Sequence, residues 1–135
     1  MILVDTSAWV EFDRATSSHV DTRLTELITT TDEVAVSEPI VMEVLAGARD
    51  DRRETDLRRL MDRFTLLRFD AGVDFHGAIR TYRTCRRSGV TPRGMVDCMI
   101  AAVALRSGAG LLTADADLDR VAGVMGIELD TARPG

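Results

Sequence analysis

Residues 1–7 have the sequence MILVDTS, in which a short apolar run ends at a carboxylate and two hydroxyls. Branched residues such as Ile2 and Val4 favour a buried strand, whereas Asp, Thr and Ser favour the turn at which a helix begins. The stretch therefore predicts a strand over residues 1–4 that runs straight into a helix.

Strand and helix signals alternate along the rest of the sequence. Residues 34–36 (VAV) predict a second strand, and Ser37 with Pro39 predicts the start of a helix that ends near Gly47. Strands that alternate with helices predict an α/β fold with a mainly parallel sheet covered on both faces. Apolar spacing predicts further helices over 18–30, 73–87 and 94–106, a helical stripe through Leu57, Leu60, Met61 and Phe64, strands over 66–69, 110–113 and 126–129, and a short helix after Ala114.

Length and charge limit the possible functions. A chain of 135 residues, 45% of them hydrophobic, predicts a single domain over residues 1–135. The net charge is −5, which argues against coating nucleic acid by bulk charge. All 17 basic residues are arginines. The absence of lysine excludes a Schiff-base enzyme and a Walker-type phosphate loop.

The cysteines and the apolar runs indicate where the protein works. Cys85 and Cys98 form no CxxC motif and have no histidine nearby, so the sequence predicts neither a zinc site nor a disulfide. Asp5 and Glu11 interrupt the apolar N-terminal stretch that a signal peptide needs. The run over residues 98–105 is far shorter than the ~20 residues that span a bilayer. We expect a cytoplasmic protein with no membrane partner.

Four single carboxylates interrupt or end apolar segments. Asp5 and Asp115 follow predicted strands, while Glu43 and Asp97 are lone charges in apolar helices. A lone carboxylate at a core-facing position is costly to desolvate without a partner. Because the carboxyl ends of parallel strands are where ligands bind, we expect the four to meet in one cleft there.

A cluster of carboxylates needs cations, since each negative charge raises the pKa of the others. Oxygen ligands without histidine or cysteine favour Mg²⁺ or Mn²⁺. Such ions activate water and stabilise the charge that develops when a phosphodiester is attacked. The pattern therefore predicts a metal-dependent nuclease.

Each carboxylate also has a structural interpretation. Asp5 and Asp115 fit helix N-caps, Glu43 fits the outer side of its helix, and Asp97 fits an acid in a first helical turn. Further residues suit supporting roles through hydrogen bonds or proximity to the cluster, and these are Thr6, Ser7, Thr113 and Asp117.

Four segments resemble the successive motifs of a PIN domain. They are the strand ending at Asp5-Thr6-Ser7, EPIVMEVLAG over residues 38–47, VDCMIAA over 96–102 and LLTADAD over 111–117. The resemblance spans nearly the whole chain and fits the stand-alone VapC toxins of bacterial toxin–antitoxin pairs. One departure is Leu118, where many members carry phenylalanine.

The resemblance implies a three-layer α/β/α fold and an Mg²⁺- or Mn²⁺-dependent endoribonuclease. Its acidic quartet corresponds to Asp5, Glu43, Asp97 and Asp115, with Asp5 and Asp97 foremost among the metal ligands. It also implies a homodimer, a cognate VapB-like antitoxin that covers the site, and growth arrest by cleavage of cellular RNA, with transfer RNA as the expected substrate.

An acid-free stretch over residues 75–96 suggests how RNA is held. Arg80, Arg83 and Arg87 fall on one helix face that leads toward Asp97, and Arg93 follows them. Such a strip suits contacts with the phosphate backbone, although a plain solvated face is the structural alternative. The mixed-charge tract over residues 49–63 fits a solvated helix.

Two other functions compete with the ribonuclease. Haloacid-dehalogenase-like and receiver-type phosphoaspartate proteins also place an acid after the first strand, but both normally use a lysine. A catalytically inactive PIN-like module that binds RNA or protein is the second alternative. Loss of one of the four acids would favour that module, and none is lost.

Overall fold

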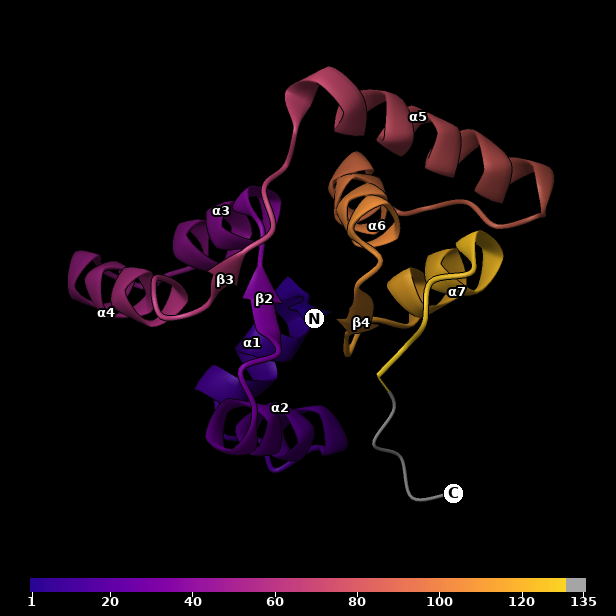
Figure 1. Ribbon diagram of the computed structural model, residues 1–135. Coiled ribbons are helices and arrows are strands. Elements are labelled where there is room, and N and C mark those ends of the chain that lie inside the picture. The colour runs from indigo at the N-terminus through magenta and orange to yellow at the C-terminus, as the bar shows by residue number, and fades with distance from the viewer. Residues whose placement is uncertain (131–135) are drawn as a thin grey trace.

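The computed structural model describes residues 1–130, so the last five residues of the predicted domain lie outside it. Four parallel strands form one sheet in the order β3-β2-β1-β4, and helices flank it (Figure 1). The α/β prediction with a parallel sheet is therefore confirmed. The elements are β1 (Ile2–Val4), α1 (Thr6–Asp13), α2 (His19–Thr30), β2 (Val34–Val36), α3 (Glu38–Ala46), α4 (Asp51–Met61), β3 (Thr65–Leu66), α5 (Ala71–Arg87), α6 (Met95–Ser107), β4 (Gly110–Leu112) and α7 (Ala116–Met125).

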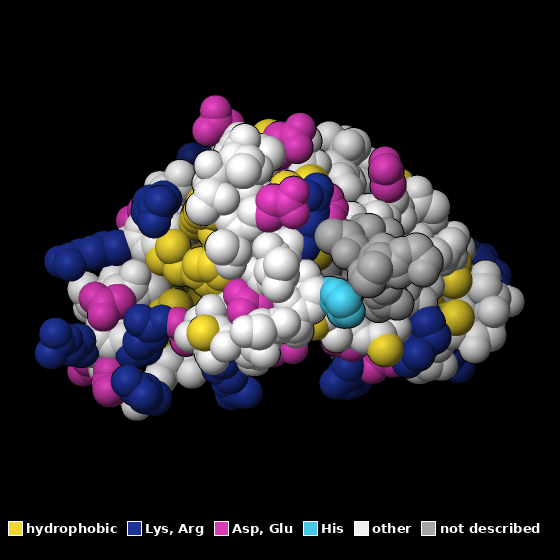
Figure 2. All heavy atoms as spheres, turned by 90° about the horizontal axis from the view of Figure 1, so that it is seen from below, with side chains coloured by type: hydrophobic (Ala, Val, Ile, Leu, Met, Phe, Trp, Pro, Cys, Tyr) yellow, Lys and Arg dark blue, Asp and Glu magenta, His cyan; other side chains and the backbone are white. Residues whose placement is uncertain are grey.

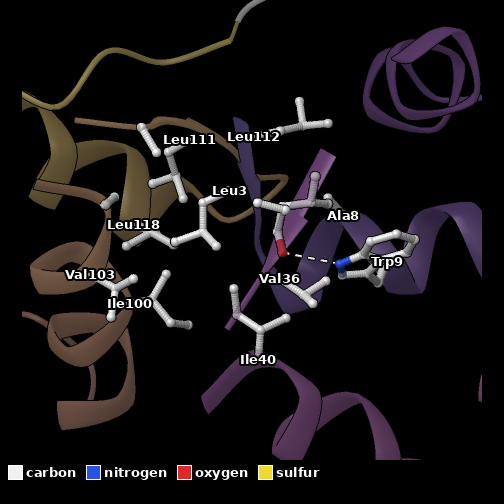
Figure 3. Packing of buried hydrophobic residues seen from close by; sticks show 14 of the residues in the cluster. Leu3, Ala8, Trp9, Val36, Ile40, Ile100, Val103, Leu111, Leu112 and Leu118 are labelled. Atoms are coloured by element: carbon white, nitrogen blue, oxygen red, sulfur yellow. Dashed lines mark hydrogen bonds between the residues drawn. The ribbon is translucent and has the colours of Figure 1, made fainter. Parts of the chain in front are cut away.

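The core forms where the apolar strands meet the apolar faces of the helices (Figure 3). Leu3 of β1 and Leu111 of β4 are fully buried, as are Ile100 of α6 and Leu118 of α7. Complete burial of such side chains stabilises a fold by about 1.5–3 kcal/mol each. Strands β1, β2 and β4 are hydrophobic on both faces because helices cover both sides of a parallel sheet, whereas the edge strand β3 is exposed.

Trp9 anchors α1 to the end of β1. Its ring is 2% exposed and packs against Phe12 and Phe64, with ring centroids 5.9 and 5.2 Å apart. Its Nε1 donates a hydrogen bond of 3.1 Å to the carbonyl oxygen of Val4 (Figure 3). This contact fixes the turn between strand and helix, which is where Asp5 lies.

An ion pair fastens α5 to α6. Asp74 is 1% exposed and accepts hydrogen bonds of 2.8 Å from both Nε and Nη2 of Arg106. Arg106 holds the pKa of Asp74 below its usual value, although burial opposes that effect. The last turn of α6 is thereby fixed against the first turn of α5.

Two strand predictions need correction. The third strand is Thr65–Leu66 rather than residues 66–69, because Glu38 accepts the Phe69 amide and the chain then leaves the sheet. Within residues 126–130 only Leu129 makes a bridge, to Leu111, where a strand over residues 126–129 was expected. The helical stripe also ends early, since Phe64 lies beyond α4.

The predicted mixed-charge helix is α4. In Figure 2, arginine and acidic side chains are interspersed at the end of the molecule that α4 occupies in Figure 1. None of the helices within residues 1–130 combines the length and the apolar composition that crossing a membrane requires.

Candidate metal centre

The end of β1 holds a buried carboxylate, Asp5, which is 3% exposed. Its Oδ2 accepts hydrogen bonds from the Ser7 hydroxyl at 2.7 Å, the Thr113 hydroxyl at 2.9 Å and the Ser7 amide at 3.3 Å. The two hydroxyl oxygens also lie 3.0 Å from each other. Within residues 1–130 no hydrogen bond reaches Oδ1, which leaves that oxygen available to a ligand.

The two hydroxyls also join β1 to the segment after β4. The Ser7 oxygen accepts the Ala114 amide at 2.9 Å, and the Thr113 oxygen accepts the Asp115 amide at 3.0 Å. The Asp5 amide donates to the Leu112 carbonyl at 2.9 Å. Two strand ends that are over 100 residues apart in sequence are thus locked together.

Glu43 reaches the same region from α3. Its Oε1 accepts a hydrogen bond of 2.8 Å from the Thr6 hydroxyl, and Thr6 directly follows Asp5. Pro39 in the first turn and Gly47 at the end define the helix that carries Glu43, as the sequence predicts. The outer-face interpretation of Glu43 is therefore wrong, because its side chain is half-buried and turned toward α1.

Asp115 and Asp117 share one cation at the start of α7. Asp115 caps the helix by accepting the Asp117 amide at 2.9 Å, so its structural interpretation as an N-cap holds. Arg93 Nη2 lies 2.7 Å from Asp115 Oδ1 and 2.7 Å from Asp117 Oδ2. Arg120 pairs with Asp117 from the next turn of the same helix.

Asp97 lies in the first turn of α6, and the charges of the other three quartet members all affect its pKa. Burial raises its pKa to about 6, and the negative charges of Asp5, Asp115 and Glu43 add to the rise in that order. Arg93 opposes it. Within residues 1–130 no hydrogen-bond donor contacts Asp97. Its half-buried carboxylate is therefore near other negative charges without a hydrogen bond that would stabilise it.

The chemistry of this cluster fits a hard divalent cation. All its candidate ligands are oxygens. Neither cysteine takes part, because burial is the main cause of a raised pKa at both Cys85 and Cys98 and so keeps the thiols protonated. In the described part of the chain, however, no three acidic, histidine or cysteine side chains stand ready to hold one ion together. Hydrogen bonds hold Asp5 and Glu43, and Arg93 holds Asp115, so the carboxylates must rotate to meet an ion.

The predicted arginine strip divides between two hollows on α5. Arg83 and Arg87 line a hollow of about 290 Å³ with Tyr82 and Arg86. Arg80 borders a separate cavity of about 500 Å³ between α5, α6 and α7, together with His76.

Sequence reasoning did not anticipate two features of the cluster. Arg93, assigned to RNA, pairs with Asp115 and Asp117, and Arg120 joins Asp117. The (i, i+3) spacing of Asp117 and Arg120 is a signal for the second pair, but nothing in the sequence connects Arg93 with residues 22 and 24 positions later.

Comparison with known proteins points to one family. The PIN domain family matches residues 2–124. Ribonuclease VapC11 of Mycobacterium tuberculosis is 42% identical over 134 residues, which cover 98% of this chain and 100% of that protein.

Solved structures share the fold. VapBC from Salmonella typhimurium, crystallised with bound DNA, has a TM-score of 0.76 at 22% identity, covering 96% of each chain. A toxin–antitoxin complex from Klebsiella pneumoniae has a TM-score of 0.63 at 17% identity, covering 82% of this chain and 83% of that one.

Proposed function

This chain belongs to the PIN-domain family, among its VapC ribonucleases, and from that membership we propose that it is the toxin of a type II toxin–antitoxin pair, an endoribonuclease that uses Mg²⁺ or Mn²⁺. The observation that carries the proposal is the environment of Asp97. Burial first, and then the carboxylates of three other elements, raise its pKa, and no hydrogen-bond donor within residues 1–130 offsets them. Such a cluster is stable in its ionised form only when a cation joins it.

The residues that would hold the ion are Asp5, Asp97, Asp115 and Glu43. When bound, a divalent cation activates water and neutralises the charge that develops on the attacked phosphate. Ser7 and Thr113 hold the Asp5 carboxylate by Oδ2 and so orient Oδ1. Thr6 does the same for Glu43 through Oε1, which leaves Oε2 for the cluster.

RNA is the proposed substrate, held by its backbone. Arg83, Arg86 and Arg87 line a hollow with Tyr82 toward the end of α5, and guanidinium groups bind phosphates in pairs of hydrogen bonds. With six aromatic residues in the chain, stacking of many bases is disfavoured. Recognition by shape and backbone suits a folded RNA, and transfer RNA is the substrate we propose.

The proposed antitoxin covers a groove that includes Glu43. The groove has a volume of about 580 Å³, lies between α1, α3 and α4, and is lined among others by Trp9, Val10 and Leu57. A partner segment lying there would block access to Glu43. A homodimer belongs to the same proposal, and apolar side chains left half exposed on α5, such as Phe75 and Ile79, suit that contact.

Cleavage by the purified protein tests the proposed function. We expect cleavage of transfer RNA with Mg²⁺ or Mn²⁺, none with chelator, and a loss of at least 100-fold in Asp97→Asn, the order of magnitude for a missing charge-stabilising group. Asp56→Asn on the exposed face of α4 is the matched control and should cleave normally.

Three outcomes decide between the functions. Cleavage that survives both chelator and Asp97→Asn would refute the metal mechanism. Cleavage of ribosomal but not transfer RNA would refute the substrate alone. No cleavage of any RNA would favour a binding module.

A further inference from the structure

One arginine stands where the proposed metal centre needs positive charge. The Arg93 side chain is 66% exposed and belongs to the segment between α5 and α6, yet a single nitrogen contacts both Asp115 and Asp117 at 2.7 Å. Those carboxylates raise the pKa of Arg93, Asp115 more than Asp117, and Asp97 adds to the effect. No other arginine contacts Asp115 within residues 1–130.

Arg93 differs from the other arginine at this cluster. Arg120 also pairs with Asp117, but it does so along the surface of α7 and does not touch Asp115. Arg93 lies four positions before Asp97 and bridges to α7, so it connects two elements that each supply a quartet member. It neutralises part of the cluster and takes up Asp115 Oδ1, an oxygen that an ion would need.

We propose that Arg93 is an internal counterion of the acidic cluster, and that a divalent cation and the Arg93 guanidinium compete for the Asp115 carboxylate. The proposal rests on the metal-dependent function argued above. It explains why the carboxylates of residues 1–130 are not arranged to hold an ion together while Arg93 is paired. Because Arg93 is largely exposed, its release requires no change in the core, and the freed guanidinium remains beside the site for a phosphate.

Metal binding without RNA tests the competition. We would titrate Mn²⁺ into the wild-type protein and into Arg93→Gln by calorimetry. Removal of the counterion should tighten Mn²⁺ binding about three- to tenfold, since the ion no longer displaces a charge-assisted pair. Arg93→Lys keeps a cation in place and should bind within about twofold of the wild type.

Arg120→Gln is the matched control, because it removes the same charge from the same cluster without freeing Asp115. We expect its Mn²⁺ affinity to stay within about twofold of the wild type. An equal gain in Arg120→Gln, or an unchanged or weaker affinity in Arg93→Gln, would overturn the competition while leaving the metal centre intact. Absence of Mn²⁺ binding in every protein would overturn the metal centre and the competition with it.

Discussion

Asp5 and Asp97 are two carboxylates of one cluster in opposite surroundings. Asp5 is the more buried, but three donors meet its Oδ2. Asp97 is less buried and has no hydrogen-bond donor within residues 1–130, so burial and like charges raise its pKa to about 6. Asp97 therefore depends on an external cation for compensation of its charge.

The raised pKa of Asp97 predicts how stability depends on pH. Its folded-state value of about 6 exceeds the ordinary 3.8, so folding favours the protonated form. The stabilisation is fully present below about pH 4 and is lost as pH rises through 6. In chelator, the free energy of unfolding of Asp97→Asn should therefore exceed that of the wild type by roughly 1–2 kcal/mol at pH 7.5, after allowance for solvent screening of this partly exposed group, and by about a third of that at pH 4.5.

Urea unfolding at the two pH values measures this difference. Asp56→Asn should follow the wild type at both. Asp74 does not interfere, because Arg106 lowers its pKa and its contribution is lost only at more acid pH. If the free energies of unfolding of Asp97→Asn and the wild type differed by the same amount at both pH values, the pKa of Asp97 would not be raised in the folded protein.

The sequence identified the four acids of the candidate metal centre, but it did not predict their hydrogen-bond and ion-pair partners. Asp5, Glu43, Asp97 and Asp115 stand out because each is a lone charge beside apolar residues. The hydrogen bonds between Asp5 and Thr113 join positions 108 apart, and no periodicity connects such positions. The Arg93 pairs are likewise products of the fold.

At the scale of elements, strand ends were predictable where the strands are buried. Both β1 and β4 are short apolar runs, and both end at the residues that the sequence marks as caps, Asp5 and Thr113–Asp115. The edge strand β3 was misplaced because Leu66 is 42% exposed and the neighbouring Phe69 packs on Phe75 instead of in the sheet. An apolar run does not reveal whether a sheet or a helix buries it.

The arginine strip of α5, formed by Arg80, Arg83 and Arg87, predicts how the protein binds RNA. In an Asp97→Asn background, which prevents cleavage, the double variant Arg80→Ala/Arg87→Ala should weaken RNA binding about tenfold at low salt. It should also lower the slope of log affinity against log salt by about 1.4–1.8, because each phosphate contact contributes about 0.7 in a single strand and about 0.9 in a duplex.

Filter binding over a salt series measures both quantities. Arg59→Ala, on the exposed side of α4, is the control and should retain the wild-type slope. Mn²⁺ binding should be unchanged in the double variant, since neither arginine contacts the quartet. An unchanged slope in Arg80→Ala/Arg87→Ala would mean that the arginine strip faces solvent and makes no contact with RNA phosphates.

At the scale of the molecule, the net charge of −5 no longer argues against a nucleic-acid partner. Four acids are assigned to the proposed metal centre, and two divalent cations would bring the total to about −1. The remaining positive charge is carried by arginine alone, and three arginines surround Tyr82 at the end of α5.

The location of Mn²⁺ in a crystal tests the central claim most directly, namely that carboxylates from four separate elements bind one metal centre. Anomalous diffraction from crystals grown with Mn²⁺ should give a peak about 2.1 Å from carboxylate oxygens of Asp5 and Asp97, with Asp115 and Glu43 around it. A peak elsewhere, or none at a Mn²⁺ concentration that supports cleavage, would contradict the claim.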